Sequence, residues 1–228
     1  MIKFSKTAAV TFLCVLFLSN SNAQKNDIVL TWNPFSFIEP DAGFTPGIEY
    51  MIGKKISLLT DAGIIFYDVF ENSRSNNNII NTEIGYKIKP EFRYYPKYSE
   101  VAKGFFLSAE GLYKHVTYKR YDGVRVFDNM GNQVYIDYNG YKIIKDVFGG
   151  SIKLGWRFYF TKTNSFGLDI YAGLGIKNKN FAIRDLPPGG SFDRNFFAAR
   201  LFNTQWQPGA TVSMPAGMKL IWRVKKAK

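Results

Sequence analysis

The sequence predicts an all-β protein, an eight-stranded antiparallel up-and-down β-barrel of the kind that spans a membrane. Three observations lead to this prediction. Long segments alternate between apolar and polar residues. The connections between these segments alternate between short and long. The N-terminus has the composition of a secretory signal peptide, which would give access to an outer membrane.

The signal peptide is expected to cover residues 1–23, with the barrel domain over 24–228. Lys3 and Lys6 supply a positive start, and residues 8–18 form an apolar core that is too short to span a bilayer. Small residues precede the expected cleavage site, which lies before Gln24.

Composition excludes several other classes of protein. The single cysteine, Cys14, lies in the expected signal peptide, so the mature chain is predicted to have neither disulfides nor thiolate metal sites. No run of 18 apolar residues follows the signal, which argues against membrane-spanning helices. The net charge of +12 fits charged loops and a lysine-rich interior, or contact with anionic lipid, better than nucleic acid in an exported protein.

The clearest alternation covers residues 80–95. One face is expected to hold Ile80, Thr82, Ile84, Tyr86, Ile88, Pro90, Phe92 and Tyr94. The other is expected to hold Asn81, Glu83, Gly85, Lys87, Lys89, Glu91, Arg93 and Tyr95. Only an extended strand separates these two sets. Because proline cannot donate to a ladder, a bulge or break is expected at Pro90.

Seven further strands follow from the same pattern. They are expected at Ile28–Ile38, Gly43–Gly53, Ile56–Phe66, Phe105–Arg120, Phe148–Phe160, Phe166–Lys177 and Thr211–Arg223. Short turns are expected at 53–55, 96–103 and 161–165, and the other connections at 39–42, 67–79, 121–142 and 178–207. With eight strands, all the long connections fall on one side, as in bacterial outer-membrane barrels.

The strands of a soluble β-sandwich would also alternate between apolar and polar residues. The length of the segments and the placement of aromatic residues near their ends favour a membrane barrel. Interfacial girdles are expected from Trp32, Tyr67, Tyr94, Tyr95, Trp156, Tyr159, Phe160 and Trp222.

The polar faces of the strands would then line the lumen. The expected acidic lining residues are Glu49, Asp61, Glu83, Glu91, Glu110 and Asp169. The expected basic ones are Lys87, Lys89, Arg93, Lys114, Lys153, Arg157, Lys177, Lys219 and Arg223. Because buried charges must pair, we expect a salt-bridge network that plugs the lumen.

The C-terminal segment Gly217–Trp222 resembles the assembly signal of outer-membrane barrels: a glycine, two free positions, a hydrophobic residue, a free position and an aromatic residue. The segment Lys89–Pro96, followed by Gly104–Phe106, adds to this likeness. The chain resembles small barrels of the OmpA and OmpX transmembrane type, and an uncharacterised outer-membrane barrel family. The resemblance implies a fold and an outer-membrane location, with no functional residues to transfer.

No catalytic, cofactor-binding or metal-ligating residues are predicted, and no cofactor is expected. The main hypothesis is a structural or surface-interaction barrel. A narrow pore or ligand-binding barrel is an alternative, and so is a lipid-modifying enzyme that uses His115, with Thr117 on its strand face and Glu110 on the opposite face. The expected partners are outer-membrane lipids, lipopolysaccharide and the barrel-assembly machinery, with no nucleic acid and a monomeric state.

Overall fold

The computed structural model describes residues 28–39, 41–52, 55–68, 80–97, 102–120, 124–128, 130–137, 140–185, 190–191 and 208–224. The expected signal peptide and its cleavage site before Gln24 lie outside these ranges. Within them, no helix has the length and apolar composition needed to cross a membrane.

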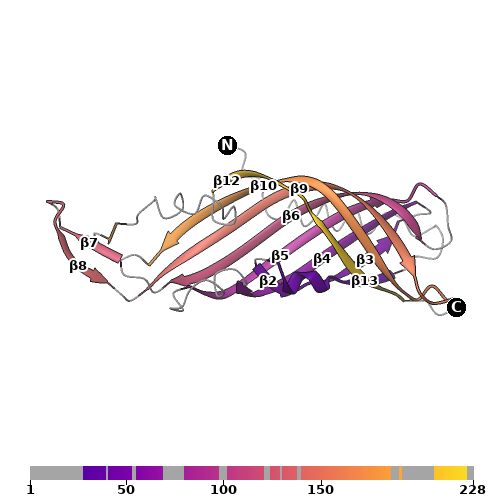
Figure 1. Ribbon diagram of the computed structural model, residues 1–228, viewed down its shortest axis with the longest axis horizontal. Helices are drawn as coiled ribbons and strands as arrows, with labels where there is room; N and C mark the ends of the chain where they lie inside the picture. The colour runs from indigo at the N-terminus through magenta and orange to yellow at the C-terminus, as the bar shows by residue number, and fades with distance from the viewer. Residues whose placement is uncertain are drawn as a thin grey trace.

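Eight antiparallel strands close into a tilted barrel, as predicted (Figure 1). In order around the ring they are β1 (Ile28–Trp32), β3 (Pro46–Met51), β4 (Ile56–Asp68), β5 (Ile80–Tyr94), β6 (Gly104–Arg120), β9 (Tyr141–Tyr159), β10 (Phe166–Arg184) and β13 (Ala216–Val224). β13 pairs back with β1 and closes the ring. Each strand therefore neighbours the strands next to it in the chain, which defines an up-and-down barrel.

Two of the predicted strands are interrupted. β2 (Asp41–Phe44) pairs with β4 just beyond β3, and β12 (Gly209–Ser213) pairs with β10 just beyond β13. Thr45 and Met214–Pro215 are the respective breaks. We call the barrel end with connections 52–55, 95–103 and 160–165 the turn end, and the opposite end the loop end.

The first strand is shorter than the predicted Ile28–Ile38. It stops at Trp32, and residues Pro34–Phe37 form a 3₁₀ turn, η1. Proline has no N–H for a ladder but suits the first turn of a helix. The side chain of Asn33 caps this turn by accepting a hydrogen bond of 3.0 Å from the backbone N–H of Phe35.

Of the bulge or break expected at Pro90, the break is found: the β5–β6 ladder stops at Ile88–Tyr113 and resumes at Glu91–Glu110, with no pair at Pro90. The register of β5 with β6 is the same on both sides of Pro90, and the shift falls instead between Thr82 and Ile84. Pro90 points outward, and a Cβ on the opposite residue, Gly111, would lie an ordinary 3.4 Å from the proline ring. The strand therefore passes Pro90 without a change of register.

The loop end contains more regular structure than predicted. β9 begins at Tyr141 and β10 ends at Arg184, so both extend into the expected loops 121–142 and 178–207. A second sheet joins β7 (Val124–Phe127), β8 (Gln133–Asp137) and β11 (Gly190–Ser191). Figure 1 shows β7 and β8 projecting beyond the ends of β6 and β9.

Two members of the expected aromatic girdle face inward instead. Tyr95 is 1% exposed, and Tyr159 lies on the same inward side of its strand as Arg157. In contrast, Tyr94, Trp156, Phe160 and Trp222 point outward and are exposed. Strand alternation explains the difference, because the side chains of neighbouring residues point to opposite faces.

Gly155 on β9 has no side chain, which leaves space for the inward ring of Phe106 on β6. A Cβ at this position would lie 2.2 Å from Cζ of Phe106, a side chain that is 0% exposed. Gly155→Ala is therefore expected to lower the free energy of unfolding by about 1–3 kcal/mol, because the core is overpacked. Gly150→Ala is the matched control on the same strand, since its nearest contact would be an ordinary 3.7 Å. Urea unfolding in lipid vesicles measures both, and equal stability of the two variants would contradict the argument.

Candidate functional site

The centre of the barrel interior is a cluster of two arginines and two carboxylates. Arg157 Nε lies 2.7 Å from Asp169 Oδ1, and Arg157 Nη2 lies 2.7 Å from Asp169 Oδ2 and 2.5 Å from Glu49 Oε2. Arg93 Nη1 donates to Asp169 Oδ2 over 2.6 Å. All four side chains are 0% exposed. β9 and β10 bring Arg157 and Asp169 into register, so the pairing follows from sheet geometry.

Neutral donors complete the coordination of Glu49. Ser57 Oγ donates to Glu49 Oε1 over 2.5 Å, and the hydroxyl of Tyr95 donates to the same oxygen over 2.9 Å. Buried carboxylates are stable only when charges and hydrogen bonds satisfy their lone pairs. The inward position of Tyr95 thus serves the ionic cluster.

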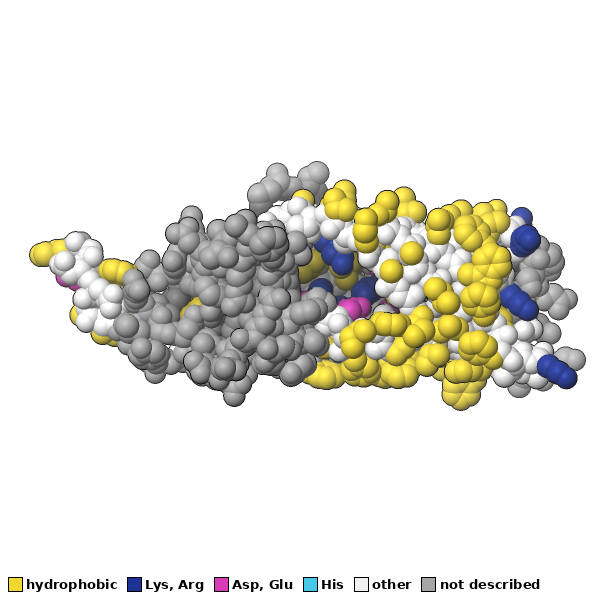
Figure 2. Space-filling model, in the orientation of Figure 1, with side chains coloured by type: hydrophobic (Ala, Val, Ile, Leu, Met, Phe, Trp, Pro, Cys, Tyr) yellow, Lys and Arg dark blue, Asp and Glu magenta, His cyan; other side chains and the backbone are white. Residues whose placement is uncertain are grey.

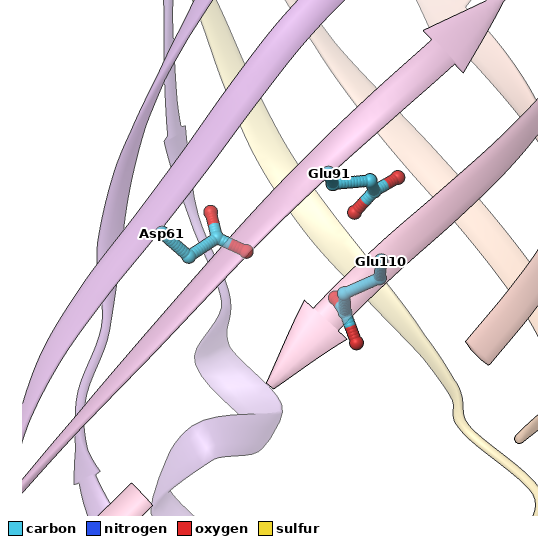
Figure 3. A group of neighbouring side chains, drawn as sticks. All are labelled: Asp61, Glu91 and Glu110. Carbon is cyan, nitrogen blue, oxygen red and sulfur yellow. The ribbon is translucent and has the colours of Figure 1, made fainter. Parts of the chain in front are cut away.

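Three more carboxylates, Asp61, Glu91 and Glu110, come from the neighbouring strands β4, β5 and β6 and point into one space (Figure 3). Two ammonium groups lie among them. Lys219 Nζ is 2.6 Å from Asp61 and 3.2 Å from Glu91, while Lys153 Nζ is 3.2 Å from Glu91 and also contacts Glu110. These lysines supply the positive charge that a metal ion would otherwise bring.

Glu91 joins this group to the arginine cluster, because its Oε1 accepts a 2.7 Å hydrogen bond from Arg93 Nε. The result is one connected network, which we call the ionic plug. Among the described residues it consists of Arg93, Lys153, Arg157, Lys219, Glu49, Asp61, Glu91, Glu110 and Asp169. Four positive and five negative groups nearly balance.

Aromatic rings fill the space between these charges. The Arg93 guanidinium lies 4.5 Å from the ring centre of Phe106, and Lys153 and Lys219 lie 4.7 and 5.5 Å from that of Tyr171. Cations over ring faces are attracted by the ring quadrupole, most strongly where water is excluded. The plug is thus packed as well as paired.

A second group of charges lies nearer the loop end. Glu39 accepts from Lys87 over 2.7 Å and lies 3.6 Å from Lys89. Asp41 is contacted by Lys114 at 2.6 Å, by Lys145 at 3.0 Å and by the hydroxyl of Tyr118. Beyond this group, an apolar cluster fills the interior with Ile65, Val116, Tyr118, Tyr141 and Ile143.

The predicted interior network is confirmed, and most of the predicted lining residues lie in it. The side chain of Glu83 lies outside the described residues. Sequence analysis missed Glu39, Asp41, Lys145 and Lys179. These residues lie in expected connections or just beyond the expected strand ends. The alternation that identifies lining residues fades there.

His115 has an acidic partner that the sequence did not reveal. Its Nδ1 lies 2.7 Å from Asp146 Oδ1, and its ring stacks on Tyr86 at 5.3 Å. His115 and Asp146 face each other across β6 and β9 on the outer surface. The contacts described for His115 are those with Asp146 and Tyr86, and the lipid-modifying alternative stays a prediction.

Comparisons with known proteins give a family and a distant likeness to a solved structure. A family model described as "Protein of unknown function (DUF3575)" matches residues 10–185. A crystal structure of a major outer membrane protein from Thermus thermophilus resembles this chain over 88% of its length and 100% of the other chain. The sequence identity is 12% and the TM-score is 0.42. A search of curated proteins found no match.

Proposed function

The chain belongs to the DUF3575 family of proteins of unknown function, and we propose that it is an integral outer-membrane barrel with a structural or surface-interaction role. In this proposal the ionic plug closes the lumen. The observation that carries the proposal is the reversal of polarity along single strands. The next two paragraphs describe it on β9.

Over its turn-end half, β9 is charged inside and apolar outside. Arg157 and Lys153 are buried, while Trp156, Leu154 and Ile152 are 48–69% exposed. Figure 2 shows this apolar exterior as a broad yellow surface. The outward residues from Phe148 to Phe158 are apolar throughout. At about 3.3 Å per residue and a tilt of about 40°, they cover about 25 Å, the height of an outer-membrane apolar band.

Nearer the loop end, β9 has an apolar residue inside the barrel and a charged residue outside, as in a protein surrounded by water. Ile143 is 0% exposed in the interior, and outward Lys142 pairs with Asp185 over 3.7 Å at the surface. A barrel in water buries apolar residues, whereas a barrel in lipid exposes them. Both arrangements on one strand support a barrel that is embedded at its turn end and projects into water at its loop end.

Contact with lipopolysaccharide or other anionic lipid is part of the proposal. Lys119, Lys142 and Arg184 lie directly across from one another on the outer faces of β6, β9 and β10. Asp185 lies 3.7 Å from Lys142, and anionic headgroups outside the barrel would add further negative charge beside this row. The row stands just beyond the apolar band, where phosphate groups of the outer leaflet would lie.

The projecting β7–β8 hairpin is the natural candidate for surface contacts. Its turn is held by Asp128, whose Oδ1 accepts from the backbone N–H groups of Met130 and Asn132 over 2.8 Å each. Hydrogen bonds from Asn132 hold the pKa of Asp128 below its ordinary value. Met130 is 88% exposed and Val134 is 62% exposed, so the hairpin offers apolar contact area.

Conductance tests whether the lumen is closed. Native protein in planar bilayers is expected to give no steady current, because paired and packed side chains cross the interior. An R93A/R157A variant, which removes both plug guanidinium groups, is expected to conduct and serves as the positive control for insertion. Heat-modifiable gel mobility confirms that each sample is folded. A large steady conductance of the native protein would refute the plug, and a fully soluble native protein would refute the membrane location.

The resemblance to the OmpA and OmpX type stays a prediction, as do export by a signal peptide, insertion by the barrel-assembly machinery and the monomeric state. Fractionation of cells that express the full chain tests whether the protein reaches the outer membrane. N-terminal sequencing of the mature protein tests whether the signal peptide is removed. Cleavage before Gln24 is the expected result.

A further inference from the structure

The turn end of the barrel carries a set of exposed lysines. Each of the three turns there contributes at least one of them: Lys55 from the β3–β4 turn, Lys97 and Lys103 from the β5–β6 turn, and Lys162 from the β9–β10 turn. Figure 2 shows dark-blue Lys or Arg side chains at this end of the molecule, just beyond the apolar exterior. We call these four residues the lysine collar.

The collar borders the apolar band of the barrel. Each collar lysine lies within three residues of an outward apolar or aromatic side chain at a strand end. Aromatic residues at the edge of the band mark the level of the lipid headgroups, and a lysine beside them extends its ammonium group toward those headgroups. The outward side chains at these strand ends, which are 36–62% exposed, are Ile56, Tyr94, Phe105 and Phe160.

Backbone hydrogen bonds hold the turns that carry the collar. The N–H of Tyr95 donates to the carbonyl of Lys55 over 2.8 Å, which ties the first turn to the second. In the third turn, the N–H of Asn164 donates to the carbonyl of Thr161 over 2.9 Å, and the N–H of Ser165 donates to Thr161 Oγ1 over 2.8 Å. The lysines therefore stand on ordered turns at the edge of the barrel wall.

The charge of this end is almost entirely positive. By sequence, the three turns contain five lysines and one carboxylate, Glu100. The exposed carboxylates in the described ranges are Asp128 and Asp185. Both belong to the loop end, where Asp185 lies 3.7 Å from Lys142. Most of the negative charge that balances the collar must therefore come from outside the chain.

We propose that the lysine collar binds the headgroups of anionic phospholipids in the leaflet at the turn end. The occupant must be negative, because the collar is positive, and it must carry apolar chains, because the collar borders the apolar band. Phosphatidylglycerol meets both conditions, and its phosphate oxygens accept hydrogen bonds from lysine ammonium groups. Short turns of bacterial barrels face the periplasm, so this is the inner leaflet of the outer membrane.

This inference rests on the membrane location proposed above, and it adds a lipid partner on the opposite side of the membrane from the Lys119–Lys142–Arg184 row. Two tryptophans near the turn end can report the contact. Trp222 is 62% exposed on β13, and Trp156 is 48% exposed on β9. The chain has four tryptophans, and the experiment uses full-length protein in which the other two are replaced by phenylalanine.

The protein is placed in phosphatidylcholine vesicles that contain a small share of lipid with brominated chains. Bromine quenches tryptophan fluorescence on contact. A comparison of brominated phosphatidylglycerol with brominated phosphatidylcholine therefore gives the relative affinity of the two lipids for the turn end. We expect a preference of about fivefold for phosphatidylglycerol at low salt, since lysines at a membrane surface attract anionic lipid. A salt concentration of about 0.5 M should remove most of it by screening.

The triple variant K97Q/K103Q/K162Q is expected to lower the preference to about one, because the charges that attract the headgroup are gone. The matched control is K119Q/K142Q/R184Q. It also removes three positive charges, but at the loop end, away from the two reporting tryptophans. The control should keep the preference of the native protein. Heat-modifiable gel mobility shows whether each variant is folded.

Equal quenching of the native protein by the two brominated lipids at low salt overturns the proposal. So does a preference that the triple variant keeps, or one that both triple variants lose to the same extent. If the collar variant does not fold, the native protein still decides, because a preference that high salt leaves unchanged is not electrostatic. Absence of quenching by either lipid refutes the membrane location itself, and the collar proposal with it.

Discussion

Arg157→Met is expected to lower the free energy of unfolding by about 3–5 kcal/mol, because it leaves buried carboxylates without their main partner. Arg157 is 0% exposed and makes three hydrogen bonds to Asp169 and Glu49. Methionine preserves much of the volume but none of the charge. Urea unfolding in phosphatidylcholine vesicles, followed by tryptophan fluorescence, measures the loss.

A double variant separates lost charge pairing from lost packing. R157M/E49Q removes one of the two orphaned carboxylates, while Asp169 keeps its 2.6 Å contact with Arg93. We expect it to recover at least about 1 kcal/mol relative to R157M, since a neutral amide is cheaper to bury than an unpaired charge. Equal stability of R157M and R157M/E49Q would show that packing alone explains the effect.

Asp41→Asn is expected to cost about 3 kcal/mol or more, because two lysines then face the interior without their shared carboxylate. Asp41 is 1% exposed and contacts Lys145, which is 2% exposed. The matched control is Asp185→Asn. It breaks an Asp–Lys pair at 3.7 Å in which Lys142 is 40% and Asp185 is 62% exposed.

The control should change the free energy of unfolding by less than about 0.5 kcal/mol, since exposed ion pairs contribute little. Both variants remove one carboxylate charge, so their difference measures burial rather than net charge. The same urea titration serves for both. A comparable loss in D41N and D185N would mean that water reaches Asp41 freely and that the loop-end interior is not desolvated.

The barrel and its lining could be predicted because the lipid-facing part of a strand is constrained at every second residue. Between Ile84 and Tyr94 each outward residue must tolerate hydrocarbon and each inward residue must fit the lumen. The segment therefore shows its two faces in the sequence alone. Pro90 was correctly expected to interrupt the ladder, but the sequence could not show that the register stays the same across the break.

The loop end could not be predicted in the same way, because its wall meets water outside and a mixture of buried apolar and charged side chains inside. Ile143 and Lys145 both face inward there, and the simple alternation that marks a membrane strand is lost. The stop of β1 at Trp32 has a local signal in Pro34, but the resulting interruption of the wall depends on how β2 and β12 pair. No periodicity in the chain contains that information.

By itself, the sequence determined that this protein is an eight-stranded barrel with a charged lumen, since alternation and loop phase are local properties of the chain. Only the tertiary structure decided which charges meet. Glu49 and Arg157 are 108 residues apart in the chain, and Lys219 reaches Asp61 across 158 residues. Those contacts depend on ring closure and register, which place distant strands side by side. They therefore assemble the nearly balanced ionic plug inside the barrel.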